Sequence, residues 1–288
     1  MNKNLLKTLL KLLLTALALY LVFRKVDSKI TFAIVEASNG FYLWLALVFF
    51  VLSKVFSAIR LNYFFKDLGL QLPAAQNFKL YGIGMFYNLF LPGGIGGDGY
   101  KVYLLNKYYK IPVKQLLQAV LLDRISGLAV LLFFMLLLLF GVNIRLVMSF
   151  DIHQLAVAAL VALFVGFYSM MHVFFKPFVN SMGITLLYAV LVQAMQLVCA
   201  YFILLALGIG SDLLAYQFVF LLSSIVAVLP LTIGGVGARE LVFILSHDYI
   251  GIDKNAAVAF SLLFFLITAI TSLVGVFFKF HVEEKSVS

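Results

Sequence analysis

Long runs of apolar residues, separated by short polar stretches, dominate the chain. Six runs are roughly 20 residues or longer and contain few charges: 5–23, 41–65, 116–140, 152–171, 184–207 and 256–280. A helix of about 20 apolar residues crosses the hydrocarbon core of a bilayer, so the pattern predicts six membrane-spanning helices. Two shorter apolar runs, 80–91 and 214–229, are each followed by a proline. We expect these two to enter the membrane and return as re-entrant segments, and a full crossing stays open as the alternative.

The composition supports this interpretation. Hydrophobic residues make up 64% and charged residues 11% of the 288 positions, and the mean hydropathy is +1.11. Soluble domains contain about 45–50% apolar and about 25% charged residues, so an ordinary soluble enzyme, a disordered protein and a DNA-binding domain are excluded. The sequence therefore predicts an all-α polytopic membrane protein. Its formal net charge of +9 indicates membrane topology and affinity for anionic lipid, and we expect no nucleic-acid partner.

The positions of the basic residues predict the orientation of the chain. If the long runs cross and the short ones return, the N-terminus, residues 66–115, residues 172–183 and the C-terminus share one side. Twelve basic residues lie on that side and six on the other. Because cytoplasmic loops carry the excess of lysine and arginine, we expect both termini to be cytoplasmic and the chain to reside in the cell membrane.

One motif occurs twice. Residues 91–101 read LPGGIGGDGYK and residues 229–239 read LPLTIGGVGAR, at a fixed offset of 138. Three predicted crossings separate the copies, and an odd number inverts the second copy. We therefore predict two inverted-topology repeats, an architecture common in secondary transporters. The predicted organisation is one integral membrane domain, 1–288, with an N-terminal span and loop (1–40), repeat 1 (41–140), a connecting span (141–183), repeat 2 (184–280) and a tail (281–288).

The residue types of the motif suit an anion-binding site. Pro92 and Pro230 lack an N–H and stop the preceding helix, while glycines allow positive φ and close backbone approach. A glycine turn before a helix presents N–H groups and a positive helix end to a phosphate. Lys101 and Arg239 add a charge to each copy. The alternative is that the glycines only allow two helices to pack tightly. The glycines concerned are Gly93, Gly94, Gly96, Gly97 and Gly99 in the first copy, and Gly234, Gly235 and Gly237 in the second.

A few charged residues lie inside the predicted spans: Lys54, Arg60, Asp123 and Arg124. A charge at the bilayer centre costs at least about 2.5–3.5 kcal/mol, so such residues usually face a cavity or a partner. We expect Arg60, Arg124 and Lys101 to surround one cavity. Asn88 and Asp98 would lie beside them, with Arg124 paired to Asp98 or to a lipid phosphate. For Arg60 the alternative is a side chain that extends to the headgroups.

Three ordered motifs resemble one family. They are NLFLPGGIGGD at 88–98, LDRISG at 122–127 and LPLTIGGVGARE at 229–240. Over about 5–280 the chain resembles the flippase-like family, also called the lysylphosphatidylglycerol synthase transmembrane region. The resemblance implies a domain that moves aminoacylated phosphatidylglycerol across the bilayer, while a separate soluble domain makes the lipid. By motif, the family positions are Asn88, Pro92, Gly93, Gly96, Gly97, Asp98, Asp123, Arg124, Pro230, Gly234, Gly235, Gly237, Arg239 and Glu240; Lys101 stands where family members often have arginine.

The sequence thus predicts a flippase or transporter that moves an anionic lipid, phospho- or isoprenoid-linked, across the cytoplasmic membrane. Fewer than about ten residues follow the last apolar run, so we expect no synthase domain and no enzymatic activity, and no cofactor or metal. The alternative is a non-catalytic accessory subunit of a lipid-modifying or glycosyltransferase complex, which would be its partner. The predicted substrate-binding residues are Arg60, Asn88, Pro92, Gly93, Gly94, Gly96, Gly97, Asp98, Lys101, Asp123, Arg124, Pro230, Gly234, Gly235, Gly237, Arg239 and Glu240.

Overall fold

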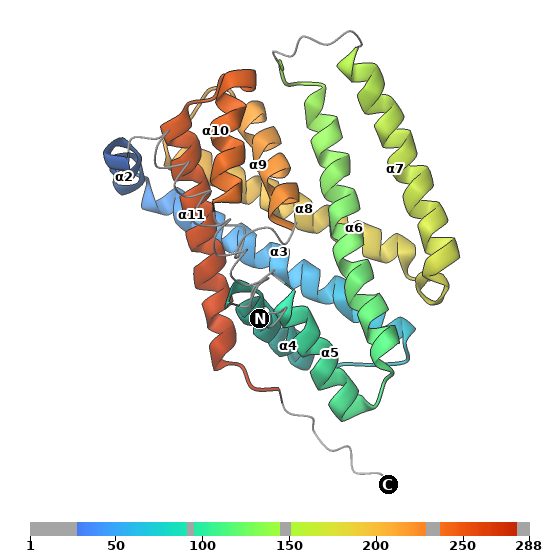
Figure 1. Ribbon diagram of the computed structural model, residues 1–288. Coiled ribbons are helices and arrows are strands. Elements are labelled where there is room, and N and C mark those ends of the chain that lie inside the picture. The colour runs from blue at the N-terminus through green and yellow to red at the C-terminus, as the bar shows by residue number, and fades with distance from the viewer. Residues whose placement is uncertain (1–27, 91–94, 145–150, 229–236, 281–288) are drawn as a thin grey trace, which may run out of the picture.

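The computed structural model of the chain describes residues 28–90, 95–144, 151–228 and 237–280. Within these ranges every regular element is a helix (Figure 1). The elements are α2 (Ser28–Glu36), α3 (Gly40–Asp67), α4 (Ala74–Phe90), α5 (Gly96–Tyr109), α6 (Val113–Leu139), α7 (Ile152–Phe174), η1 (Lys176–Phe178), α8 (Met182–Ala206), α9 (Leu213–Val228), α10 (Ala238–Ile250), α11 (Lys254–Leu273) and η2 (Val274–Phe277).

Five helices are long and apolar enough to cross a membrane. They are α3, α6, α7, α8 and the continuous helix formed by α11 and η2, with 28, 27, 23, 25 and 24 residues. Five of the six predicted long helices are therefore confirmed, and the remaining run, 5–23, lies outside the described residues. The chain is a multi-pass membrane protein, because five apolar helices of this length satisfy their own backbone groups within a bilayer.

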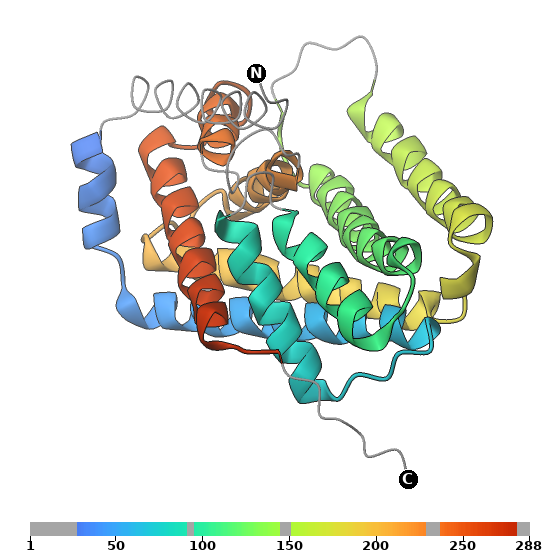
Figure 2. The same ribbon diagram turned by 60° about the horizontal axis from the view of Figure 1, so that its bottom comes forward.

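α3 and α8 lie side by side and run in opposite directions (Figures 1 and 2). At one end of the pair the Asn39 N–H donates to the carbonyl oxygen of Ala206 over 2.8 Å. At the other end the Ser181 hydroxyl donates to the carboxylate of Asp67. Small buried residues allow this close approach along the pair: Ala46, Ser53, Ser57 and Ala58 on α3, and Ala189, Cys199 and Ala200 on α8. The pair forms one side of the fold, against which α4, α6, α9 and α11 pack.

Each helix of this pair ends in the same way. Gly69 follows α3 with φ 78° and Gly208 follows α8 with φ 71°, a conformation that glycine adopts without strain. The next residue then donates back into the last turn: Leu70 to the Phe65 carbonyl and Ile209 to the Leu204 carbonyl. This αL ending with a six-to-one hydrogen bond is a Schellman motif. It accounts for the glycine at both positions, because the residue in the αL conformation is usually glycine.

The helices after each of these turns follow in the same order. A helical pair, α4 with α5 or α9 with α10, is followed by a long helix, α6 or α11. In Figure 1, α5 begins near the middle of the molecule and runs to its lower end, whereas α10 begins near the middle and runs to its upper end. The beginnings of α5 and α10 are therefore both central, and the predicted basic motif residues lie within the first two turns of these helices.

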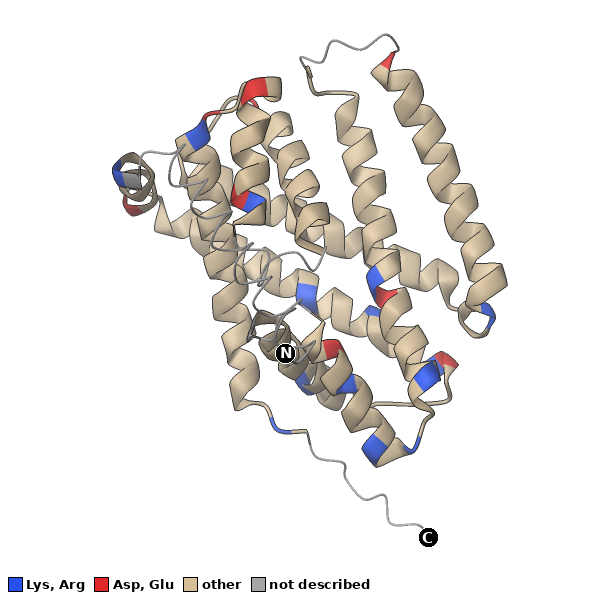
Figure 3. Cartoon of the chain, viewed as in Figure 1, with Lys and Arg blue, Asp and Glu red and all other residues tan. Residues whose placement is uncertain are grey.

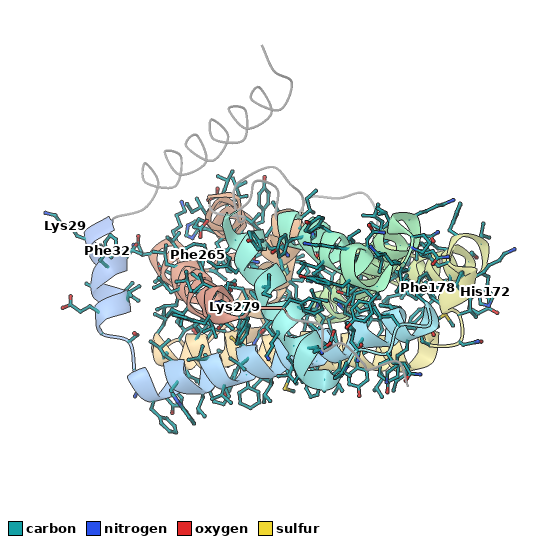
Figure 4. All side chains as sticks on the ribbon, turned by 90° about the horizontal axis from the view of Figure 1, so that it is seen from below. Lys29, Phe32, His172, Phe178, Phe265 and Lys279 are labelled. Carbon is teal, nitrogen blue, oxygen red and sulfur yellow. The ribbon has the colours of Figure 1, made fainter. Side chains whose placement is uncertain are left out.

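The two edges of the molecule are formed by α2 and α7. Figure 4 shows Lys29 on α2 and His172 on α7 at opposite edges, with their side chains directed away from the fold. α7 packs mainly against α6 and leaves large apolar side chains exposed, among them Phe164, Val165 and Phe174. Such a continuous apolar surface suits a helix that faces lipid.

Candidate functional site

A cavity of about 310 Å³ lies between helices from both halves of the chain. Charged residues on α3, α5, α6 and α10 lie close to the centre of the fold, as Figure 3 shows. The polar and charged residues that line the cavity are Lys54, Ser57 and Arg60 of α3, Tyr81 and Asn88 of α4, Asp98 and Lys101 of α5, Asp123 and Arg124 of α6, Gln193 and Gln196 of α8, Ser224 of α9, Arg239 of α10 and Thr268 of α11.

Arg60 is held inside the protein by Asp123. Its Nε lies 2.8 Å from Asp123 Oδ1, and the two side chains are 6% and 12% exposed. Gly127 makes room for this guanidinium, because a Cβ at that position would lie 3.3 Å from both Arg60 Nη atoms. Arg60 Nη1 has no hydrogen-bond partner among the described residues. The side chain of Arg60 therefore faces the cavity and does not extend to the headgroups.

Asp98 binds two basic side chains. Its Oδ1 lies 3.1 Å from Lys101 Nζ, and its other oxygen accepts from Arg124 Nε. The predicted pairing of Arg124 with Asp98 is thereby confirmed. Lys101 is 4% exposed, and its ammonium also lies 4.5 Å from the centre of the Tyr81 ring. Adjacent residues of α6 thus bind different helices, Asp123 to α3 and Arg124 to α5.

The first glycine motif packs two helices together. Gly96, Gly97 and Gly99 form the first turn of α5 and do not have positive φ, so of the two conformations that the sequence left open, the glycine turn is not adopted at these three positions. The N–H of Gly97, in the first turn where N–H groups lack a partner within the helix, donates to Asn88 Oδ1 over 2.8 Å. A Cβ on Gly97 would overlap the carbonyl of Gly84. Close packing, the alternative interpretation of the glycines, therefore holds for Gly97.

The second motif caps a helix. Gly237, with φ 81°, precedes α10, and its N–H donates to Glu240 Oε2 over 2.7 Å. The other carboxylate oxygen of Glu240 accepts from the Ser261 hydroxyl over 2.8 Å. Glu240 is 4% exposed, and both of its oxygens are bound within the protein. The remaining predicted site residues lie outside the described residues: Pro92, Gly93, Gly94, Pro230, Gly234 and Gly235.

Replacing Glu240 with alanine is expected to destabilise the protein by about 1–3 kcal/mol, because the Gly237 N–H and the Ser261 hydroxyl lose their acceptor. The measurement is thermal unfolding in mild detergent, followed by circular dichroism. Asp248→Ala provides the control on the same helix. The Asp248 side chain is 56% exposed, and its Oδ1 lies 3.8 Å from Lys254 Nζ, so its removal leaves no buried group without a partner. Equal unfolding midpoints for the two variants would contradict the capping role of Glu240.

Several cavity residues are absent from the predicted set. Lys54, Gln193, Gln196 and Ser224 line the cavity but do not belong to the repeated motif. In the sequence they are marked only as polar residues within an otherwise apolar run. This does not distinguish a residue that lines a cavity from one whose side chain hydrogen-bonds to the backbone of its own helix. Lys54 carried the strongest signal, because a charged residue within a span is costly unless it faces a cavity or a partner.

The cavity has an excess of positive charge. Five basic side chains line it, and two carboxylates lie among them, which leaves a formal excess of three positive charges. Because the effective dielectric constant inside a protein is far below that of water, this excess favours an anion strongly. The arrangement can hold a phosphate or carboxylate group between the two halves of the chain.

Comparison with known proteins places the chain in a family. The family model described as the lysylphosphatidylglycerol synthase transmembrane region matches residues 8–275. A search of curated proteins finds no match. The family match covers all the helices that line the cavity, which agrees with the resemblance of the three sequence motifs. The chain belongs to the lysylphosphatidylglycerol synthase transmembrane-region family.

Proposed function

We propose that this protein moves an anionic lipid, phospho- or isoprenoid-linked, across the cytoplasmic membrane, with the lipid headgroup in the central cavity. The observation that carries the proposal is the excess of basic side chains in a cavity lined by both halves of the chain. A headgroup phosphate would offset the cost of these charges inside the membrane. Family membership supports a role that involves lipid.

The arrangement of the short helices supports transport by alternating access. α5 and α10 have 14 and 13 residues, roughly 20 Å at helical rise, which is too short to cross a hydrocarbon core of about 30 Å. Both begin centrally and run to opposite ends (Figure 1). We interpret α4–α5 and α9–α10 as re-entrant hairpins of two inverted repeats, whose positive helix ends point at a shared site.

The cavity lies at the contact between the two proposed repeats. Arg60, Asp98 and Arg124 belong to the first, and Gln193, Ser224 and Arg239 to the second. A rocking motion of one repeat against the other would open such a site to each side of the membrane in turn. With both termini in the cytoplasm, the hairpin of α4 and α5 would face the cytoplasmic side.

In liposomes that contain the purified protein, labelled phosphatidylglycerol is expected to cross the bilayer at least about tenfold faster than in protein-free vesicles. This rate increase corresponds to an activation free energy lower by roughly 1.4 kcal/mol. The measurement is the fraction of headgroup-labelled lipid that a membrane-impermeant quencher reaches over time. Labelled phosphatidylcholine is the matched control lipid, because its headgroup has no net charge. Equilibration no faster than in empty vesicles would contradict transport and would favour the accessory-subunit alternative.

A further inference from the structure

Two basic residues of the cavity have no carboxylate partner in the described part of the chain. Arg60 is paired with Asp123, and Asp98 binds both Lys101 and Arg124. Lys54 on α3 and Arg239 on α10 line the same cavity and form no ion pair with any carboxylate whose position the structure gives. Among the described residues, Lys54 and Arg239 therefore carry two of the three excess positive charges of the cavity, and the third is shared by Lys101 and Arg124, which both bind Asp98.

Lys54 and Arg239 each lie over one ring of an aromatic pair. Lys54 Nζ is 4.4 Å from the centre of the Phe50 ring, and Arg239 Cζ is 4.9 Å from the centre of the Phe264 ring. The two rings meet edge to face, with centroids 5.7 Å apart and an interplanar angle of 83°. A ring face orients a cation and attracts it weakly, but it does not neutralise the charge. Both cations are thus positioned and still able to bind an anion.

Polar groups without a partner line the same cavity. The hydroxyl of Ser224 and the amide oxygen of Gln193 are buried and have no hydrogen-bond partner among the described residues. Buried polar groups are normally hydrogen-bonded, and those left over commonly mark the site of a water, an ion or a ligand. The Ser224 hydroxyl can donate to an anion, and the oxygen of Gln193 can accept from a hydroxyl or ammonium group of the same ligand.

We propose that Lys54 and Arg239 together bind the phosphate of the transported lipid, an inference that rests on the proposed function. A guanidinium can donate two parallel hydrogen bonds to a phosphate, and an ammonium adds a point charge. The three paired cations instead hold α3, α5 and α6 together through Asp98 and Asp123. Because Lys54 belongs to the first half of the chain and Arg239 to the second, a phosphate bound by both would stabilise one relative arrangement of the halves.

The test compares the double variant Lys54→Gln, Arg239→Gln with the wild-type protein and with Lys254→Gln. Lys254 is the first residue of α11 and does not line the cavity. Its Nζ lies 3.8 Å from Asp248 Oδ1. The probes are fluorescent phosphatidylglycerol in detergent micelles and inorganic phosphate alone. We expect the double variant to bind phosphatidylglycerol at least about tenfold more weakly, and Lys254→Gln to bind it as the wild-type protein does. If the double variant loses binding of inorganic phosphate but binds phosphatidylglycerol as the wild-type protein does, the pair binds free phosphate and not a lipid headgroup.

Stability without added lipid is a second measurement. Because neither charge has a carboxylate partner among the residues whose positions are described, their neutralisation is expected to leave the unfolding midpoint unchanged or to raise it. A double variant that binds both probes as the wild-type protein does, or that unfolds at a lower temperature, would overturn the assignment. Wild-type protein that binds phosphatidylglycerol through this pair but does not move it would instead contradict the transport function alone.

Discussion

Replacing Gly97 with alanine is expected to destabilise the protein strongly, although the change adds a single methyl group. The new Cβ would overlap the carbonyl group of Gly84 and lie 2.9 Å from Asn88 Oδ1. The first of these neighbours is backbone of α4, so relief requires a shift of the whole helix. Overpacking at a rigid contact costs about 1–3 kcal/mol or more. Separation of α4 from α5 would also break the hydrogen bond from Gly97 to Asn88.

Gly99 provides a matched control two residues further along the same helix. A Cβ on Gly99 meets nothing within 4 Å, and alanine has a higher helix propensity than glycine by about 1 kcal/mol. We expect Gly99→Ala to yield monodisperse protein with an unchanged or higher unfolding midpoint, and Gly97→Ala to give aggregate in gel filtration. Two variants of equal yield and stability would mean that α4 and α5 are not in contact at Gly97.

Replacing Asp123 with asparagine is expected to cost about 3–5 kcal/mol of stability, because it leaves Arg60 buried without its counter-charge. The Arg60 side chain is 6% exposed, so it is largely removed from bulk water. The measurement is the thermal unfolding midpoint in detergent, together with the yield of folded protein. The effect should depend weakly on salt, because buried pairs are screened much less than exposed ones.

The double variant Arg60→Met, Asp123→Leu tests whether the uncompensated charge causes this loss. Removal of both partners leaves no buried charge, and apolar replacements of an ion pair are often neutral or stabilising. We expect the double variant to recover most of the stability that Asp123→Asn loses, and a double-mutant cycle measures the coupling. A double variant no more stable than Asp123→Asn would show that packing, and not charge, connects α3 with α6 at this point.

The sequence predicted the local part of the site better than the long-range part. The pairing of Arg124 with Asp98 was one of two predicted alternatives, the other being a lipid phosphate. The pair of Arg60 with Asp123 joins positions 63 residues apart and was not predicted. For Gly97 the sequence left a turn and close helix packing open, since glycine suits both. In the structure the carbonyl group of Gly84 leaves no room for a Cβ on Gly97, which favours close packing of α4 and α5.

The apolar runs alone determined the class of the protein and the positions of five spanning helices. The reason is that a bilayer imposes a minimum length of apolar helix, whatever the neighbouring helices are. Only the tertiary structure decided which charges are compensated. Lys54 and Arg239 are far apart in the chain, and their role depends on Phe50 and Phe264, which meet only after α3 and α11 have packed. Electrostatic interactions depend on distance in space and on burial, and a linear sequence contains neither quantity.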